Sequence, residues 1–267
     1  MTYETILYDV SERIATITLN RPEVLNAISP LMARELKDAY AAAEADPEVW
    51  IVIVTGVGRA FCTGADVSDI PGTGQVVYEE AYLSTHEQWD APQEASPPFR
   101  TMTKPVVAAI QGLCAGAGMD LLSTADVVIA ADHVEFLDPH VSIGLVSARE
   151  AVRYARVLPL NVAMRFALMG KQERLSAQRF YDLGLITELV PVDELPDRAR
   201  EIARMVNRNA PLAVRGTRMA IRKGLALPVY EAELLAETYR ERVTRTEDAL
   251  EGPKAFVEKR APEWQCR

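Results

Sequence analysis

Two short segments of small residues have the composition of a site that holds a negatively charged oxygen with the protein backbone. The first extends from Gly58 to Asp66, and the second from Gln111 to Asp120. Small side chains let a ligand approach the main chain, where N–H groups can stabilise an anion or a developing oxyanion, more strongly where a helix begins. Taken singly, each segment is more typical of a tight turn, and only the two together indicate a binding site.

Three side chains at or after the second segment can carry protons. Asp120 ends that segment, and His140 and Glu150 follow it. Histidine exchanges a proton near neutral pH, and two acid–base groups in different environments can divide the roles of acid and base. The alternative for His140 is an inert pocket residue. The alternative for Glu150, which we weight above catalysis, is a capping box, because residues 147–150 are Ser-Ala-Arg-Glu.

Other polar residues are expected to be structural. Asp138 precedes Pro139, a pattern typical of a turn. Asp66 is interpreted as a carboxylate that shapes its loop. The cysteines and histidines lack the spacing of a metal site, so no metal is expected. Gly116-Ala117-Gly118 lacks the third glycine of a dinucleotide fingerprint, which argues against a dinucleotide cofactor.

The composition is that of an ordinary soluble protein with an acidic balance. The 267 residues include 29 Lys and Arg against 38 Asp and Glu, a formal net charge of −9. This balance argues against a general nucleic-acid or membrane-surface binder, since both need a basic face. No apolar stretch approaches the ~18 residues of a membrane span, and the N-terminus lacks the pattern of a signal peptide. The three cysteines cannot all pair, and we expect a cytoplasmic protein with reduced thiols.

The pattern of apolar residues predicts strands that alternate with helices, then a helical C-terminal third, and therefore an α/β fold. One helix is expected to begin at Ser29-Pro30, with serine as N-cap, and another near Met119. An amphipathic helix is expected over Asp197 to Asn207. Residues 56–64 are expected to form a loop, and residues 71–98 a loop with one helix. The predicted strands are 5–10 and 14–19, which form a hairpin, then 50–54, 105–110, 126–130 and 135–137.

Over nearly the whole chain, the sequence resembles the enoyl-CoA hydratase/isomerase (crotonase) family. Six motifs stand in the family's order. They are Asn20-Arg21-Pro22 with Leu25-Asn26-Ala27, Arg59 to Asp66, Lys104 to Gly112, Ala115 to Leu121, Met169-Gly170-Lys171 with Leu175-Ser176-Ala177, and Gly184-Leu185-Ile186 with the ending Glu251 to Phe256. The resemblance implies the crotonase (ClpP/crotonase-like) fold, a spiral of ββα units with a helical C-terminal region.

The same resemblance implies an acyl-coenzyme A thioester as substrate, with no other cofactor. The N–H groups of Ala65 and Ala117 match the family's oxyanion-hole donors, and Ser68 stands where the family has a basic residue. The resemblance also implies a spiral core over residues 1–195 and a helical trimerisation region over residues 196–267, in a homotrimer or homohexamer. The positions that match substrate-binding residues of the family are Leu25, Ala27, Gly64, Asp66, Val67 and Gly116.

The acid–base positions depart from the family's hydratases, which carry two glutamates. The first position is Asp120, one methylene shorter, and the second is His140. Dienoyl-CoA isomerases of the family carry aspartate at the first position. Three functions stay open: hydration or isomerisation of an enoyl-CoA, carbon–carbon hydrolysis of a cyclic β-diketone by His140 with Glu150 or Asp120, and acyl-CoA binding without catalysis. The intact small-residue segments argue against the last.

Overall fold

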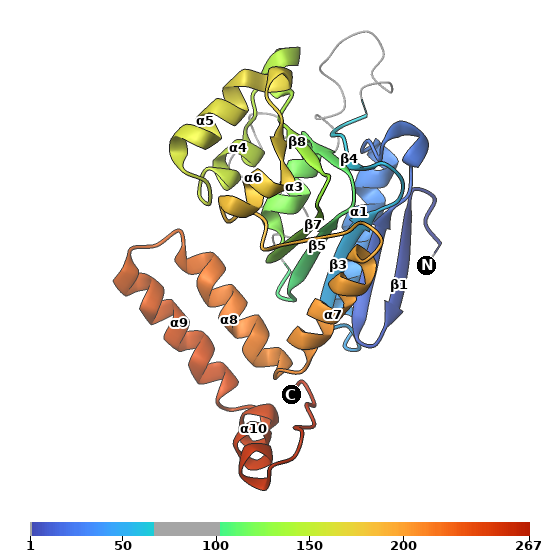
Figure 1. Cartoon of the computed structure of the whole chain (residues 1–267). Helices are drawn as coiled ribbons and strands as arrows, with labels where there is room; N and C mark the ends of the chain where they lie inside the picture. The colour runs from blue at the N-terminus through green and yellow to red at the C-terminus, as the bar shows by residue number, and fades with distance from the viewer. Residues whose placement is uncertain (1, 67–101) are drawn as a thin grey trace, which may run out of the picture.

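A six-stranded sheet forms the centre of the fold in the computed structural model, which describes residues 2–66 and 102–267 (Figure 1). The first two strands form the predicted antiparallel hairpin, and each later strand lies parallel to its neighbour. The loop and helix expected within residues 71–98 lie outside the described residues. In spatial order the strands are β1 (Ile6–Ser11), β2 (Ile14–Leu19), β3 (Ile51–Gly56), β5 (Val106–Ile110), β7 (Val127–Ala131) and β10 (Glu188–Val190).

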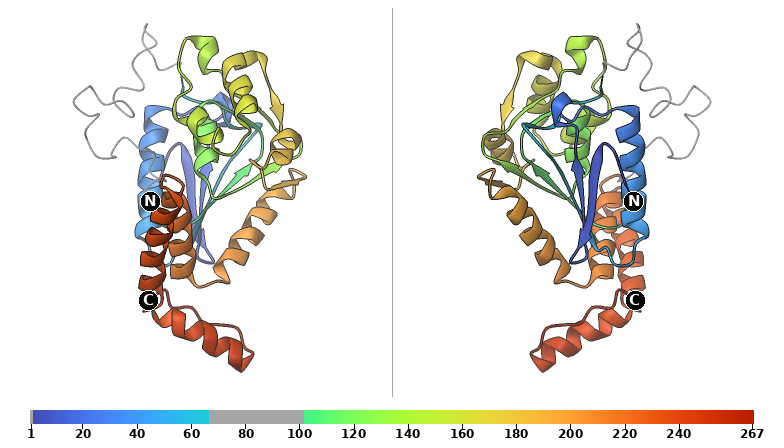
Figure 2. Two further views of the ribbon diagram at one scale, coloured as in Figure 1. Left: turned by 90° about the vertical axis from the view of Figure 1, so that its left-hand side faces the viewer. Right: turned by 90° about the vertical axis from the view of Figure 1, so that its right-hand side faces the viewer.

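Both faces of this sheet are buried, which explains the continuous apolar runs of its central strands. Along β3, Val52 points into one apolar core and Ile53 into another. Strands covered on both sides need no polar face. Helix α1 (Pro30–Ala45) contributes to the first core and α7 (Leu195–Asn207) to the second, so the two helices lie on opposite sides of the sheet (Figure 2).

Both covering helices have the features that the sequence predicts. Ser29 is the N-cap of α1, and its Oγ accepts a hydrogen bond from the Met32 N–H at 3.2 Å. On α7 the residues Ala199, Ile202 and Ala203 are buried, as their helical spacing indicates. The serine cap of α1 and the apolar face of α7 are therefore confirmed.

A second, smaller sheet carries the two segments of small residues. The prediction of a loop over residues 56–64 is wrong where β4 forms, at residues 60–62. The strands β6, β9 and β10 were not expected either. These strands are two or three residues long, too short for an apolar period to show. In spatial order the strands of this sheet are β4 (Ala60–Cys62), β6 (Leu113–Ala115), β8 (Glu135–Leu137) and β9 (Leu175–Ser176).

Four helices lie around the smaller sheet, and aromatic rings join three of them to one another and to β8. The ring centroids of Tyr154 and Phe166 are 5.5 Å apart, those of Phe166 and Phe180 are 5.4 Å apart, and Phe136 on β8 lies 4.8 Å from Phe180. Such tilted and edge-on pairs are favourable ring geometries. They fix α4, the helix of Tyr154, which carries several polar residues discussed below. The helices are α3 (Ala117–Thr124), α4 (Arg149–Tyr154), α5 (Leu160–Met169) and α6 (Ala177–Asp182).

The C-terminal third is helical, as predicted. Its last three helices, α8 (Pro211–Gly224), α9 (Val229–Val243) and α10 (Glu247–Glu258), extend away from the central sheet (Figure 1). None of the side chains of α9 is buried. Within the described parts of the chain, none of the helices combines the length and apolar character that a membrane crossing requires.

The buried side chain of Asn26 ties the N-terminal loop to β4. Its Nδ2 donates hydrogen bonds to the carbonyl oxygens of Val57 and Ala60, at 2.9 and 2.8 Å, and its Oδ1 accepts one from the Arg21 N–H at 2.8 Å. Leu25 and Asn26 both have a left-handed backbone, with φ of 57° and 55°. This strained turn is therefore held in place directly beside the first small-residue segment.

Two thiols lie between β4 and β6. Cys62 and Cys114 stand opposite each other in these parallel strands, and both are fully buried and free. Burial raises the pKa of the Cys62 thiol to about 12 and raises that of Cys114 well above its usual range. A Cβ atom at Gly118 would come within 2.6 Å of the Cys62 carbonyl oxygen, so β4 packs directly against α3.

A side chain at Gly112, between β5 and β6, should be strongly destabilising. A Cβ atom there would lie 2.3 Å from the Arg59 carbonyl oxygen and 2.9 Å from the Ala60 nitrogen, both backbone atoms. We expect Gly112→Ala to lower the free energy of unfolding by about 3 kcal/mol, at the upper end for overpacking. Gly184→Ala is the comparison, because Gly184 has open space around it, so that only its left-handed φ of 81° costs stability, about 1–2 kcal/mol. Equal losses in urea titrations of the two variants would contradict the packing argument.

Candidate active site

The first small-residue segment presents the N–H group of Ala65 away from its neighbouring chain. The Ile28 N–H donates to the Gly64 carbonyl oxygen at 2.8 Å, and the Asp66 N–H donates to the Ile28 carbonyl oxygen at 3.0 Å. Successive N–H groups of extended chain point to opposite sides. The N–H of Ala65, between these two residues, therefore faces away from Ile28.

The second segment presents the N–H group of Ala117 at the start of a helix. α3 begins at Ala117, two residues before the expected start near Met119, because Gly116 takes a φ of 52° that turns the chain from β6 directly into the helix. The first N–H groups of a helix have no partner within it and lie at the positive end of its dipole. The N–H of Ala117 is thus suited to hold an anionic oxygen.

The two segments are in direct contact. A Cβ atom at Gly116 would lie 3.3 Å from the Gly64 Cα, and one at Gly64 would lie 3.6 Å from the Ala117 nitrogen. Gly64 has a φ of 102°, so a side chain there would also strain the backbone. The structure therefore brings together the segments that the sequence singles out, with Ala65 and Ala117 on adjoining stretches of chain.

His140 lies beside these segments and is paired with Asp138. The imidazole Cε1 is 3.9 Å from the Cβ position of Gly116, and Nδ1 is 2.5 Å from Asp138 Oδ1. An ionised carboxylate can only accept, so the proton between them belongs to Nδ1 and the neutral ring has its basic nitrogen at Nε2. The hydrogen bond and negative charge of Asp138 raise the pKa of His140, although burial opposes this.

Asp138 is a central acceptor rather than only a turn residue. It is fully buried, and besides His140 it accepts hydrogen bonds from the hydroxyl groups of Ser147 and Tyr154, the latter at 2.9 Å. Burial alone would raise the pKa of Asp138, but these donors and the charge of His140 hold its pKa below the usual range. The sequence could have indicated the pair through the Asp-Pro-His spacing, since an aspartate can bond the backbone and side chain two residues on. The His140 N–H indeed lies 3.4 Å from Asp138 Oδ1.

Two expectations about this region are wrong. The carboxylate that pairs with His140 is Asp138, and neither Glu150 nor Asp120. The expected capping box is absent as well: the N-cap of α4 is Ala148, without a side-chain bond, and Ser147 donates to Asp138 instead. A buried carboxylate needs donors more than a short exposed helix end needs a cap.

Asp120 is buried and held by arginines of α4. Arg153 Nη1 donates a hydrogen bond to Asp120 Oδ1, and Arg149 Nε lies 3.9 Å from Oδ2. These two arginines stand four residues apart and therefore share one face of α4. Asp120 is thus the ion-pair partner of two guanidinium groups, an arrangement less suited to proton transfer than that of His140.

Glu150 is buried on the same helix, with 4% of its surface exposed. Burial raises the pKa of Glu150, and the negative charge of Asp120 raises it further. The charge of Glu150 in turn contributes to the raised pKa of His140, so the two groups are electrostatically coupled. The site therefore contains a histidine whose pKa is raised by a carboxylate and a carboxylic acid whose pKa is raised by burial.

The residues expected along the substrate are only partly described. Gly64 and Gly116 lie at the contact between the two segments, while Val67 and Ser68 lie outside the described residues. Asp66 is buried and pairs with Arg21 Nη1 at 2.8 Å, which agrees with a loop-shaping role.

Leu25 and Ala27 lie in the loop held by the same arginine. Arg21 Nη1 also donates to the Ala27 carbonyl oxygen at 2.7 Å. Leu25 ends the short helix η1 (Pro22–Val24), and its carbonyl oxygen accepts a hydrogen bond from Thr63 Oγ1 at 3.3 Å. Both residues are therefore adjacent to the first small-residue segment. In the described ranges, no cluster of three His, Cys, Asp or Glu side chains has the arrangement of a metal site.

A family model described as enoyl-CoA hydratase/isomerase matches residues 9–267. The chain belongs to the enoyl-CoA hydratase/isomerase family. A crystal structure of an enoyl-CoA hydratase/isomerase from Mycobacterium paratuberculosis is 64% identical, covers 100% of both chains and superposes with a TM-score of 0.92. This chain is also 31% identical to a probable enoyl-CoA hydratase of Mycobacterium bovis over 100% of both proteins. It is 33% identical to a mevalonyl-coenzyme A hydratase of Aspergillus fumigatus, over 94% of this chain and 91% of that relative.

Membership of the enoyl-CoA hydratase/isomerase family confirms the expected crotonase fold and an enzyme of the hydratase class. The mycobacterial crystal structure and this chain share the α/β core of parallel strands and the helical C-terminal region. The departure from two glutamates therefore occurs inside an established family fold, and the pairing of His140 with Asp138 becomes the feature to test.

We expect Asp138→Asn to lower the pKa of His140, because the variant removes the negative charge that favours the imidazolium. NMR titration of the His140 ring protons measures this pKa directly, with His133 as an internal control because it lies on the exposed surface. Tyr154→Phe, which keeps the Asp138 charge, should move the pKa less. An unchanged His140 pKa in Asp138→Asn would contradict the assigned coupling.

The same coupling has a signed effect on stability. Since the pKa of His140 is raised in the folded protein, its protonation stabilises the fold fully at pH values below the unfolded pKa, and this contribution is lost as the pH rises through the folded pKa. The free energy of unfolding of Asp138→Asn, followed over that range, should lack this pH-dependent loss.

Proposed function

We propose that the protein hydrates or isomerises the double bond of an enoyl-CoA, through a thioester enolate held by the N–H groups of Ala65 and Ala117. The observation that carries the proposal is the position of His140, whose imidazole borders Gly116 next to one of these donors and is oriented by the buried Asp138. The relatives named as hydratases of enoyl-CoA and of mevalonyl-coenzyme A support an acyl-CoA substrate. No other cofactor is needed for this chemistry.

In the isomerisation, neutral His140 takes a proton from a carbon next to the double bond. The C–H bond breaks, the proton passes to Nε2, and the electron pair spreads to the thioester oxygen, where the two N–H groups stabilise the charge. The imidazolium is stabilised by Asp138. Return of the same proton to the other end of the system completes the shift of the double bond.

In the hydration, two groups share the work. His140 accepts a proton from water as the oxygen bonds to the β-carbon, and Glu150 supplies a proton to the α-carbon. Burial favours the protonated form of Glu150, which suits an acid, and His140 acts as the base in its neutral form. Asp120, paired with Arg153 and Arg149, acts on this pair through its charge.

A second candidate function is hydrolysis of a carbon–carbon bond in a cyclic β-diketone. The fully buried Asp138 paired with His140 Nδ1 is an arrangement that activates water, and this pairing favours the candidate. Water adds to one carbonyl, the adjacent C–C bond breaks, and the resulting enolate takes a proton. The two candidates use the same residues and differ in substrate.

The C-terminal helices support an oligomer, a homotrimer or homohexamer in our proposal. α9 and α10 expose large apolar side chains, among them Val229, Tyr230, Phe256 and Val257, with exposed fractions from 68% to 85%. Large apolar side chains exposed next to one another in the chain, as in the pairs Val229-Tyr230 and Phe256-Val257, are found at protein interfaces. Burial of these side chains between subunits would complete the packing that α9 lacks in the single chain.

The assay that tests the function compares crotonyl-CoA, a dienoyl-CoA and a cyclic β-diketone. We expect weak hydration of crotonyl-CoA and faster turnover of another unsaturated acyl-CoA.

His140→Gln should lower kcat on the preferred substrate by roughly 10²–10⁴-fold, the usual contribution of a general acid–base group. The rate should decrease as the pH is lowered through the pKa of His140, because only the neutral imidazole accepts a proton. Since this pKa is raised, the decrease should begin above ~6.5, the ordinary histidine value. Efficient crotonyl-CoA hydration that survives His140→Gln would refute the role of His140, and turnover of only the diketone would select the second candidate.

Ala117→Pro tests the oxyanion donor without breaking the helix. Proline lacks the N–H group but is well accepted at the first position of a helix, which Ala117 occupies. We expect a loss of about 10²–10³-fold in kcat, as for other oxyanion donors, with an unchanged circular dichroism spectrum. Ala117→Gly, which keeps the N–H group, is the control and should retain most activity. Near-normal turnover in folded Ala117→Pro would remove this N–H from the mechanism.

A further inference from the structure

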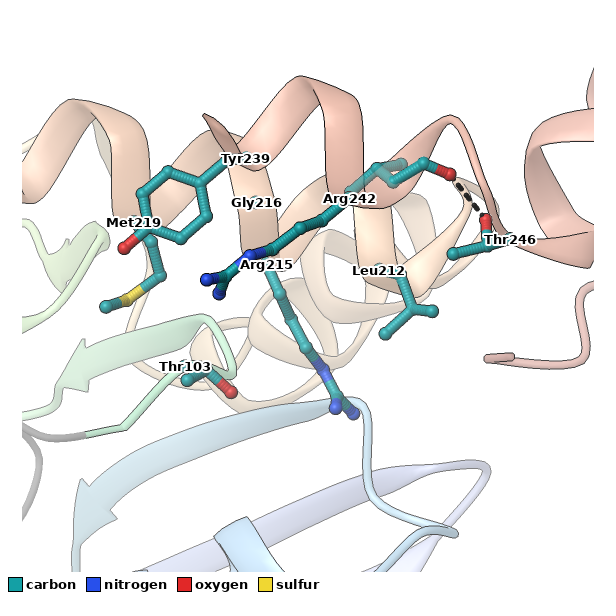
Figure 3. A pocket seen from close by; sticks show the side chains of 9 residues that line it. Thr103, Leu212, Arg215, Gly216, Met219, Tyr239, Arg242 and Thr246 are labelled. Carbon is teal, nitrogen blue, oxygen red and sulfur yellow. Dashed lines mark hydrogen bonds between the residues drawn. The ribbon is translucent and has the colours of Figure 1, made fainter. Parts of the chain in front are cut away.

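A pocket away from the candidate active site lies between α8, α9 and the chain just before β5 (Figure 3). It has a volume of about 270 Å³. Thr103 lies three residues before Val106, the first residue of β5, whereas the candidate active site follows the carboxyl end of that strand. Five residues of strand span ~17 Å, so the pocket and the active site lie at opposite ends of the sheet.

Two arginines line this pocket. Arg215 extends from α8 toward the strand ends, and Arg242 extends from α9 across toward α8 (Figure 3). Arg215 Nε is buried without a hydrogen-bond partner in the described ranges, and its Nη2 makes only a long contact of 3.5 Å to the Val49 carbonyl oxygen. Among the residues that the structure describes, neither arginine has a carboxylate within 4.0 Å.

Two neighbouring arginines of α8 are paired with a carboxylate. Arg218 and Arg222, one and two turns further along, both bind the carboxylate of Asp126, with Nε–oxygen distances of 2.6 and 2.8 Å. A buried guanidinium nitrogen without an acceptor costs free energy that such a pairing recovers. This cost applies to the buried Nε of Arg215, whereas Arg242 lines the pocket as an exposed side chain. Both differ from Arg218 and Arg222 in having no carboxylate partner among the described residues.

Other charges around the pocket do not supply that anion. Lys104 is buried beside it and adds positive charge: its pKa is lowered by burial and by the charge of Arg215. Glu44 accepts hydrogen bonds from the N–H and hydroxyl of Thr103 and from the Lys104 N–H, at 2.6 to 3.4 Å. Its carboxylate is thus committed to the start of β5.

The rest of the lining is apolar or aromatic. Leu212, Met219 and Val243 contribute aliphatic surface, and Tyr239 contributes a ring. The volume corresponds to roughly nine water molecules at ~30 Å³ each, which suits a ligand of similar size. An anion of this kind would need one charged group and a compact apolar body.

We propose that this pocket is a binding site for a small organic carboxylate, held through its charge by Arg215 and Arg242 and through its body by the apolar lining. The site is separate from the acyl-CoA chemistry and does not depend on it. A carboxylate side chain of a second copy of the chain is the competing occupant, and the experiment distinguishes the two.

Calorimetric titration of the full chain with benzoate and with benzamide tests the proposal. The two probes have nearly the same shape and differ in charge. We expect saturable binding of one benzoate per chain and at least tenfold weaker binding of benzamide. Arg242→Gln and Arg215→Gln should each weaken benzoate binding by about tenfold or more, as expected for a charge-assisted hydrogen bond.

Arg245→Gln is the matched control, because it removes the same charge just beyond the end of α9 and Arg245 does not line the pocket. It should leave benzoate binding unchanged. Arg215→Lys, which keeps the charge, should bind better than Arg215→Gln, and thermal melts establish that each variant is folded. If Arg215→Gln does not fold, Arg242→Gln decides.

Three results would overturn the proposal. They are absence of benzoate binding, equal binding of benzamide, and equal effects of Arg242→Gln and Arg245→Gln. Light scattering tests the competing occupant, a second copy of the chain. A change in subunit number in Arg242→Gln, with no effect on benzoate binding, would show that Arg242 binds a neighbouring chain instead.

Discussion

The contact between Gly64 and Gly116 is the constraint around which the candidate site is arranged. Two backbone segments meet with no side chain between them, and both glycines have positive φ. This contact requires β4 and β6 to lie next to each other, and Asn26 and Gly112 maintain that arrangement from either side. This contact also places the N–H groups of Ala65 and Ala117 near each other, because each residue directly follows one of the two glycines.

The burial of Asp138 fixes the second half of the site. A carboxylate without exposure to solvent must be matched by donors, and here they come from His140, Ser147 and Tyr154, residues that would otherwise be free to move apart. Leaving such a charge unpaired would cost several kcal/mol. The network thus joins the short helix η5 (His140–Ile143), the connection to α4, and α4 itself, and it sets where Glu150 lies.

The long elements could be predicted from sequence, because their signals are local, whereas the two small-residue segments were indicative only as a pair. The apolar runs of β3 and β5 and the Ser29-Pro30 start of α1 each depend on residues within a few positions of one another. The role of Asp138 could not be predicted in the same way, since Tyr154 is sixteen residues away and reaches it only after α4 has packed. The arginine pairs of Asp120 are similar: the spacing of Arg149 and Arg153 shows a common face, but only the fold shows which carboxylate that face meets.

The two buried sulfur atoms beside the small-residue segments have a consequence of their own. Cys62 and Cys114 are fully buried with raised pKa values, so neither is a thiolate while β4 and β6 stay packed. Alkylating and oxidising reagents attack the thiolate. Both thiols are therefore protected from oxidants while β4 and β6 stay packed. The rate at which they become modified measures how often the smaller sheet opens locally.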